Sequence, residues 1–154
     1  MGTATDGFWT RPIHETKELF LKLLPKRQQI MESHIGLCLI YHYLAVQASQ
    51  RRLEQAIINL MIALEALLIK EGDKIRGCLA TRGAALIAEN EEKRTLISQR
   101  MRELYDLRSH IVHGRGKKPT FNDTKQLFNY TRKSLEKTLS LETLSKEELI
   151  EKLN

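Results

Sequence analysis

The sequence predicts an all-α protein, a helical bundle of about five to six helices. Apolar residues recur at helical spacings over most of the 154 residues, and no segment keeps the period-2 alternation of a strand for more than a few residues. Only three prolines and eight glycines occur, and several, among them Pro25 and Gly72, fall between the periodic segments. We therefore expect an irregular arm over residues 1–13 and one helical domain over residues 14–154.

The periodic segments define the expected helices in chain order. They are His14–Leu24, Lys26–Gln47, Ser49–Lys70, Lys74–Ala88, Glu91–His113, Asn122–Leu141 and a short amphipathic helix in the tail SKEELIEKL. No Gly or Pro separates the second helix from the third, so one long helix stays possible; we prefer a break near Ala48 with Ser49 as N-cap. Gly114 suits the left-handed position that follows a helix C-terminus.

Composition and charge narrow the class of protein. The net charge of +6 and the pI near 9.4 make a nucleic acid or another polyanion a plausible partner. The apolar runs are short and broken by charges, and the first ten residues lack the pattern of a signal peptide, so we expect no membrane segment. Cys38 and Cys78 lie in apolar patterns without metal spacing, which is typical of reduced thiols in a cytoplasmic protein.

Two charged residues lie where apolar side chains are expected. Glu65 is surrounded by isoleucines and a methionine at helical spacing, and Arg108 falls near the centre of an apolar face. A buried carboxylate is costly unless it is paired, so we expect Glu65 to contact an arginine of a neighbouring helix, either Arg108 or Arg82. Such a pair either fixes only the helix register or orients Arg108 in a cleft.

The segment Leu104–Gly116, LYDLRSHIVHGRG, combines Arg108 with His113 and a basic loop. Histidine can transfer the protons of RNA cleavage without a metal, arginine can stabilise the phosphorane-like transition state, and further cations can hold flanking phosphates. Arg115, Lys117 and Lys118 are the candidates for that last role. Cations near a helix C-terminus also favour the helix macrodipole whatever the function. No spacing of a metal site or phosphate loop occurs, so we expect neither a metal nor a cofactor.

Arg108 and His113 cannot share a face of one straight helix, because five residues turn the helix by about 140°. Two arrangements remain: the helix frays at Gly114, or a second copy supplies the facing pair across a symmetric dimer. Tyr105 and Phe121 could stack a base near the loop, although aromatics at such spacings more often pack in the core.

Several of these residues occur in an order that resembles the HEPN superfamily, in particular its Apea-like branch. The resemblance is strongest over residues 51–139 and rests on IALEALL at Ile62–Leu68, on Arg82, on RSHIVHG at Arg108–Gly114 and on Arg132. It implies an all-α bundle, commonly dimeric, with the R-x4-H motif at the dimer cleft. Many such proteins are metal-independent endoribonucleases of defence, toxin–antitoxin or stress systems, and others only bind RNA or nucleotides, or mediate assembly.

The resemblance assigns roles to individual residues. His113 would be the acid/base, Arg108 the phosphate ligand, and Glu65, Ser109 and Tyr105 supporting residues. Many HEPN ribonucleases carry Asn, Asp or His after the arginine, whereas Ser109 stands here and orients a histidine less strongly. The expected partners are a second copy of the chain, RNA or a nucleotide, and an antitoxin or a fused effector domain.

Overall fold

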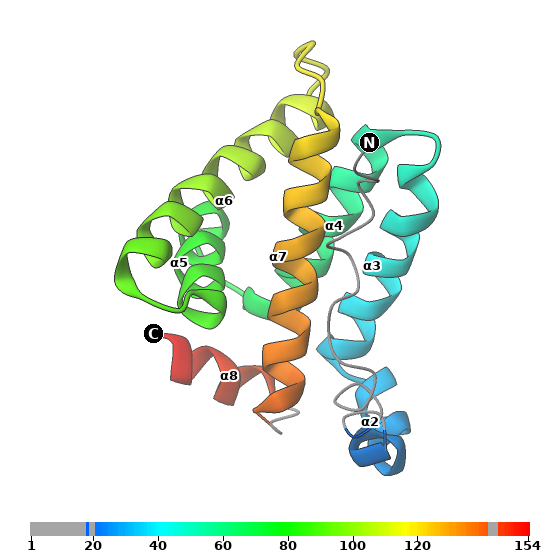
Figure 1. The fold of residues 1–154 in the computed structure, drawn as a ribbon, viewed down its shortest axis with the longest axis vertical. Helices are drawn as coiled ribbons and strands as arrows, with labels where there is room; N and C mark the ends of the chain where they lie inside the picture. The colour runs from blue at the N-terminus through cyan, green and yellow to red at the C-terminus, as the bar shows by residue number, and fades with distance from the viewer. Residues whose placement is uncertain (1–17, 19–20, 142–144) are drawn as a thin grey trace, which may run out of the picture.

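The computed structural model describes residues 18, 21–141 and 145–154, and this part of the chain is all-helical, with no strand (Figure 1). The all-α prediction is confirmed. The expected arm over residues 1–13 and most of the first expected helix lie outside the described residues. A 3-10 turn, η1 (Leu24–Lys26), precedes seven α-helices. They are α2 (Arg27–Met31), α3 (His34–Ser49), α4 (Leu53–Leu68), α5 (Ile75–Ile87), α6 (Glu91–Val112), α7 (Phe121–Ser140) and α8 (Lys146–Leu153).

The segment expected as one helix over Lys26–Gln47 is divided in two. The break falls at Ser33, whose extended backbone lets its hydroxyl accept a hydrogen bond from the amide of Ile35 and cap α3. The prediction of Ser49 as an N-cap is wrong, because α3 continues through Ser49 and the hydroxyl donates back to the carbonyl of Val46. Arg52 precedes α4 without a side-chain cap. The preferred separation of α3 from α4 is confirmed, a few residues later than expected.

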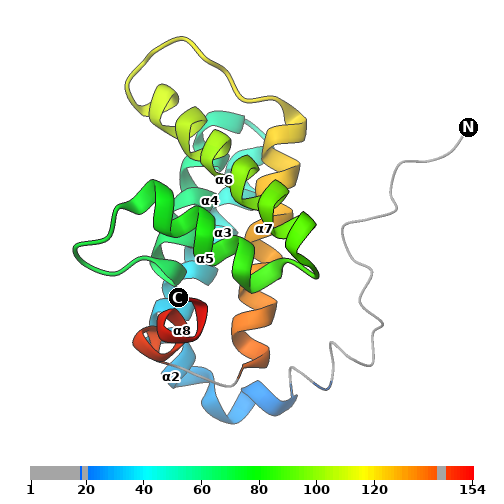
Figure 2. The same ribbon diagram turned by 90° about the vertical axis from the view of Figure 1, so that its left-hand side faces the viewer.

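Helix α4 lies at the centre of the bundle and contacts α3, α5, α6, α7 and α8. Figures 1 and 2 show α3 and α6 on opposite sides of the molecule, with α4 and α7 between them. No helix in the described part of the chain is long and apolar enough to cross a membrane. The buried residues of α4 are Ala56, Ile57, Asn59, Leu60, Met61, Ala63, Leu64, Leu67 and Leu68.

The loop between α6 and α7 is fixed at both ends. Gly114 has φ +64° and closes α6 as predicted: its amide bonds the carbonyl of Ile111, and the Arg115 amide bonds that of His110. At the other end, Thr120 and Asp123 form a capping box at the start of α7. The basic loop is thus held between two ordered helix ends at the top of Figure 1.

Gly36 provides a sharp test of the contact between α2 and α3. A Cβ at this position would lie 2.2 Å from the carbonyl oxygen of Met31, whereas a Cβ at Gly77 in α5 would meet no heavy atom within 4 Å. We expect Gly36→Ala to lower the free energy of unfolding by about 1–3 kcal/mol, because a backbone atom must move. The matched Gly77→Ala should raise it by about 0.5–1 kcal/mol. Urea titrations check both, and equal effects of the two variants would contradict this packing.

Candidate functional site

Glu65 and Arg108 form a half-buried polar pair between α4 and α6. The Oε1 atom of Glu65 and the Nε atom of Arg108 are buried, and neither has a hydrogen-bond partner among the residues that the structure describes. Burial raises the pKa of Glu65, and the nearby positive charge of Arg108 opposes that rise. Arg108 is therefore the cationic neighbour of Glu65, but the two side chains make no ion pair within hydrogen-bond reach.

The guanidinium of Arg108 keeps free donors. It makes no hydrogen bond among the described residues, and Nε is the only one of its nitrogens that is buried without a partner. The group lies over the ring of Tyr105, with 5.8 Å from Cζ to the ring centroid, so the ring supports its position through a cation–π contact. The terminal nitrogens of Arg108 can therefore bind an anion that approaches from solvent.

Arg82, the alternative partner of Glu65, is used elsewhere. It is 5% exposed, and its terminal nitrogens donate to both carboxylate oxygens of Asp73 at 2.5 and 3.2 Å. It also donates to the carbonyl of Leu68 at 2.8 Å and to the side chain of Asn154 at 3.1 Å. The hydrogen bond from Arg82 is the main cause that lowers the pKa of Asp73 to about 2. This cluster ties the end of α4 to α5 and α8, and it is structural.

His113 lies apart from Arg108. It is the exposed C-cap residue of α6, whereas Arg108 is half-buried one and a half turns earlier. The helix does not fray before Gly114, so one chain does not bring the two side chains together. Ser109 is half-buried and makes no side-chain hydrogen bond that would orient His113 among the described residues.

A second histidine, His110, is oriented by the helix itself. Its Nδ1 atom lies 2.6 Å from the backbone carbonyl of Asp106, which can only accept, so the Nδ1 atom carries the proton. Asp106 also receives two hydrogen bonds of 2.7 Å from Arg76. Those bonds are the main cause that lowers the pKa of Asp106, and the charges of His110 and Lys117 act in the same direction. Lys117 therefore lies near this corner of α6.

The cations of the loop are free to meet a ligand. Arg115, Lys117 and Lys118 are exposed and make no ion pair among the described residues. Phe121 begins α7 with 71% of its surface exposed, so packing in the core is the wrong interpretation for this aromatic. The loop presents positive charge and one free aromatic side chain to solvent.

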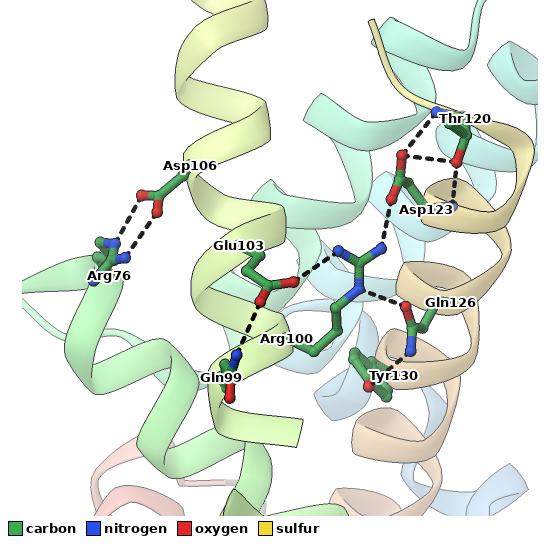
Figure 3. A network of polar contacts seen from close by, with 9 residues as sticks. All are labelled: Arg76, Gln99, Arg100, Glu103, Asp106, Thr120, Asp123, Gln126 and Tyr130. Atoms are coloured by element: carbon green, nitrogen blue, oxygen red, sulfur yellow. Dashed lines mark hydrogen bonds and ion pairs between the residues drawn. The ribbon is translucent and has the colours of Figure 1, made fainter. Parts of the chain in front are cut away.

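Arg100 anchors α6 to the start of α7 and so positions this loop (Figure 3). It donates to Asp123, to Gln126 at 2.7 Å and to Glu103 at 3.0 Å, and Gln126 donates in turn to Tyr130. Sequence reasoning did not find this network. The pattern Thr120-x-x-Asp123 signals the capping box, but only the fold shows that Asp123 also accepts from Arg100.

An open groove of about 480 Å³ runs between α5 and the first half of α6. Arg102 lines it, is exposed, and lies on the same face of α6 as Ser109 and His113, seven and eleven residues later. The lining residues of the groove are Thr81, Ala84, Glu91, Arg94, Thr95, Ser98, Gln99 and Arg102.

Other chemistry receives no support from side-chain clusters in the described residues. No three His, Cys, Asp or Glu side chains gather there in a way that could hold a metal ion. Cys38 is buried, which raises the pKa of its thiol to about 12, and Cys78 is partly buried; both are free thiols. Comparison with protein-family models, with curated proteins and with solved structures finds no match. Functional inference therefore rests on the residues of this chain.

Proposed function

We propose that this chain is a HEPN-like, RNA-acting domain that cleaves RNA without a metal ion. The main support is Arg108, a half-buried arginine with free terminal donors, held beside Glu65 and over Tyr105. A phosphate is a suitable ligand for such a guanidinium, because two parallel N–H donors match two phosphate oxygens. The exposed Arg115, Lys117 and Lys118 and the net charge of +6 favour a polyanion over a lone phosphate.

The reaction follows from these groups. The 2′-oxygen of a ribose forms a bond to the adjacent phosphorus while the bond to the 5′-oxygen breaks, which leaves a 2′,3′-cyclic phosphate and a 5′-hydroxyl. His113 transfers a proton, either from the 2′-hydroxyl or to the leaving oxygen. Arg108 stabilises the negative charge that builds up on the phosphorus oxygens.

The positions of the two residues make a shared site necessary for cleavage. Arg108 and His113 are about 140° apart around α6, so a single chain does not present both to one phosphate. A second copy with its α6 end opposite the first would place His113 of one chain beside Arg108 of the other. The active form that we propose is therefore a homodimer.

The same geometry favours a second candidate, an RNA- or nucleotide-binding module without catalysis. Arg108 binds its phosphate in that case, and His113 remains an exposed side chain that Ser109 does not orient. Both candidates place the protein in the cytoplasm, in a defence, toxin or stress system, with an antitoxin or a fused effector domain as a possible regulator.

Replacing the loop cations should weaken RNA binding more than replacing other cations. We expect Arg115→Gln/Lys117→Gln/Lys118→Gln to reduce the affinity for a mixed-sequence single-stranded RNA at least about tenfold and to lower the salt slope by about 2, since each lost phosphate contact removes about 0.7. Fluorescence anisotropy at several salt concentrations measures both quantities.

The control removes three exposed lysines of α7 and α8, so its net charge equals that of the triple variant of the loop. Lys133→Gln/Lys137→Gln/Lys152→Gln should keep most of the affinity of the parent. Equal losses in the two triple variants would show that only net charge matters, and a parent that does not bind RNA at low salt would contradict the proposal.

A further inference from the structure

Phe121, the first residue of α7, exposes its ring to solvent. Its exposed fraction of 71% is the largest among the large apolar residues that the structure describes. The ring makes no aromatic or cation–π contact within the described part of the chain, whereas the ring of Tyr105 already holds the guanidinium of Arg108. Of the two aromatic residues that the sequence offers for stacking near the loop, Phe121 is therefore the one whose ring faces are free.

The backbone on both sides of Phe121 is fixed. Pro119 is buried, and the capping box joins Thr120 to Asp123 through hydrogen bonds between 2.8 and 3.1 Å. Asp123 also accepts a hydrogen bond from Arg100, which ties the start of α7 to α6 (Figure 3). The fold thus presents the ring to solvent at a defined place, so a ligand that binds there needs to order little of the backbone.

Two lysines lie close to the ring. Lys118 precedes Phe121 by three residues, so at most about 11 Å separates their Cα atoms. Lys125 follows Phe121 by four residues, which places both on one face of α7 with about 5–6 Å between their Cβ atoms. Both lysines are exposed and make no ion pair among the described residues. Positive charge is therefore available on both sides of the ring.

Negative charge is scarce in the same segment. Residues 107–135 contain seven arginines and lysines but one acidic residue, Asp123. Its two carboxylate oxygens accept hydrogen bonds from Arg100 and Thr120. An anion that approaches Phe121 therefore meets cations and no free carboxylate of this segment.

We propose that Phe121 is a stacking platform for an unpaired base of a nucleic acid strand whose phosphates bind the lysines on either side. An aromatic ring among cations is suited to a single strand, because every base has a π-face and every nucleotide carries a phosphate. The bases of a duplex stack on one another and offer no free face. This inference rests on the proposed function and specifies its substrate class, RNA that is single-stranded at the loop.

The composition of the loop favours a base over a lipid surface. A segment that lies in a membrane interface buries a broad apolar face. Between residues 113 and 123, Phe121 is the one large apolar side chain, and Thr120 and Asn122 flank it. One ring suffices to stack a base, whereas it makes a small membrane anchor.

Binding of three probes tests the stacking. They are a mixed-sequence single-stranded RNA, the duplex that it forms with its complement, and inorganic polyphosphate, which carries charge without bases. We expect Phe121→Ala to weaken binding of the single strand about 5- to 150-fold, the range for one lost base–aromatic contact. Binding of the duplex and of polyphosphate should stay unchanged, because the cations that hold the phosphates remain.

Further variants separate stacking from simple apolar contact. Phe121→Leu should lose as much affinity as Phe121→Ala, since it is apolar but has no π-face, and Phe121→Trp should keep the affinity. Tyr43→Ala is the matched control, because Tyr43 is 61% exposed on α3 and lies outside the loop and α7. It should bind the single strand like the parent, and circular dichroism should show all variants folded.

Fluorescence reports the contact directly. The chain has one tryptophan, Trp9, so the variant Trp9→Phe/Phe121→Trp carries its single indole at the proposed platform. Its emission should be quenched when the single-stranded RNA binds and should not change with polyphosphate.

The possible failures are distinguishable. Single-strand binding that Phe121→Ala leaves unchanged, or equal losses for all three probes, would overturn the stacking and leave the proposed function standing. Binding to vesicles of anionic phospholipid that Phe121→Ala abolishes, with RNA binding unchanged, would assign the ring to a lipid surface instead. A parent that binds neither RNA probe would overturn the proposed function together with the stacking.

Discussion

Arg82→Ala is expected to lower the free energy of unfolding by about 3–5 kcal/mol, the largest effect on stability that we foresee from one substitution. The change leaves the carbonyl of Leu68 without its side-chain donor and the carboxylate of Asp73 with only the amide of Lys70 as a donor, at a site where Arg82 is only 5% exposed. It also frees Asn154 from α5. Urea denaturation followed by circular dichroism measures the loss.

Arg76→Ala is the matched control for this prediction. Arg76 makes a bidentate ion pair with Asp106 at 2.7 Å, but both side chains are largely exposed, at 51% and 43%. Surface pairs contribute little, so the melting temperature should stay close to that of the parent. If Arg82→Ala also kept a melting temperature close to that of the parent, the buried cluster would not stabilise the fold.

The same cluster should make the protein sensitive to acid. The pKa of Asp73 is about 2 in the folded state, because Arg82 holds its ionised form, and about 3.9 in an unfolded chain. A carboxyl whose pKa is lowered on folding stabilises the fold fully above about pH 4, and this contribution is lost as the pH falls towards 2. Stability should therefore fall more steeply between pH 4 and pH 2 in the parent than in Asp73→Asn, and parallel curves would count against the pair.

His113→Ala has the largest expected effect on activity, a loss of about 10²–10⁴-fold in the rate of RNA cleavage. The reason is the loss of its proton-transfer group, since an exposed C-cap side chain contributes little to packing. Cleavage of end-labelled RNA in EDTA measures the rate, and the products should end in 2′,3′-cyclic phosphates.

The neighbouring histidine supplies the control. His110 bonds the carbonyl of Asp106 and lies elsewhere around α6, so His110→Ala should keep most of the activity. Equal cleavage by the parent and by His113→Ala would identify the activity as a contaminant. A full loss of activity in His110→Ala together with an active His113→Ala would show that His110, and not His113, transfers the proton.

Much of the fold could be predicted because its signals are local. Helical spacing of apolar residues is enough to place α4, α5, α6 and α7 to within a few residues, and Gly114 marks the end of α6 because it takes a positive φ. The break at Ser33 was missed, since neither Gly nor Pro marks it and it depends on a single serine cap. A cap of this kind can be predicted only when the direction of the chain before and after it is known.

The candidate site was only partly predictable. The sequence shows that Glu65 and Arg108 interrupt apolar faces, but it leaves Arg82 and Arg108 as equal partners, because both follow at plausible positions on later helices. Which arginine lies beside Glu65 depends on Asp73, because Asp73 accepts the hydrogen bonds of Arg82. Asp73 lies in a loop, where no periodic pattern predicts this contact. The missing hydrogen bond between Glu65 and Arg108 is likewise a result of packing geometry alone.

The central claim is that Arg108 of one chain and His113 of another act on the same phosphate, and mixing two inactive variants tests it most directly. Arg108→Ala and His113→Ala should each fail to cleave RNA in EDTA. In an equal mixture, half of the dimers combine both variants and half of their sites are intact, so about a quarter of the parent's activity should return. An active parent whose two variants do not complement each other would contradict a shared site, and an inactive parent would contradict cleavage itself.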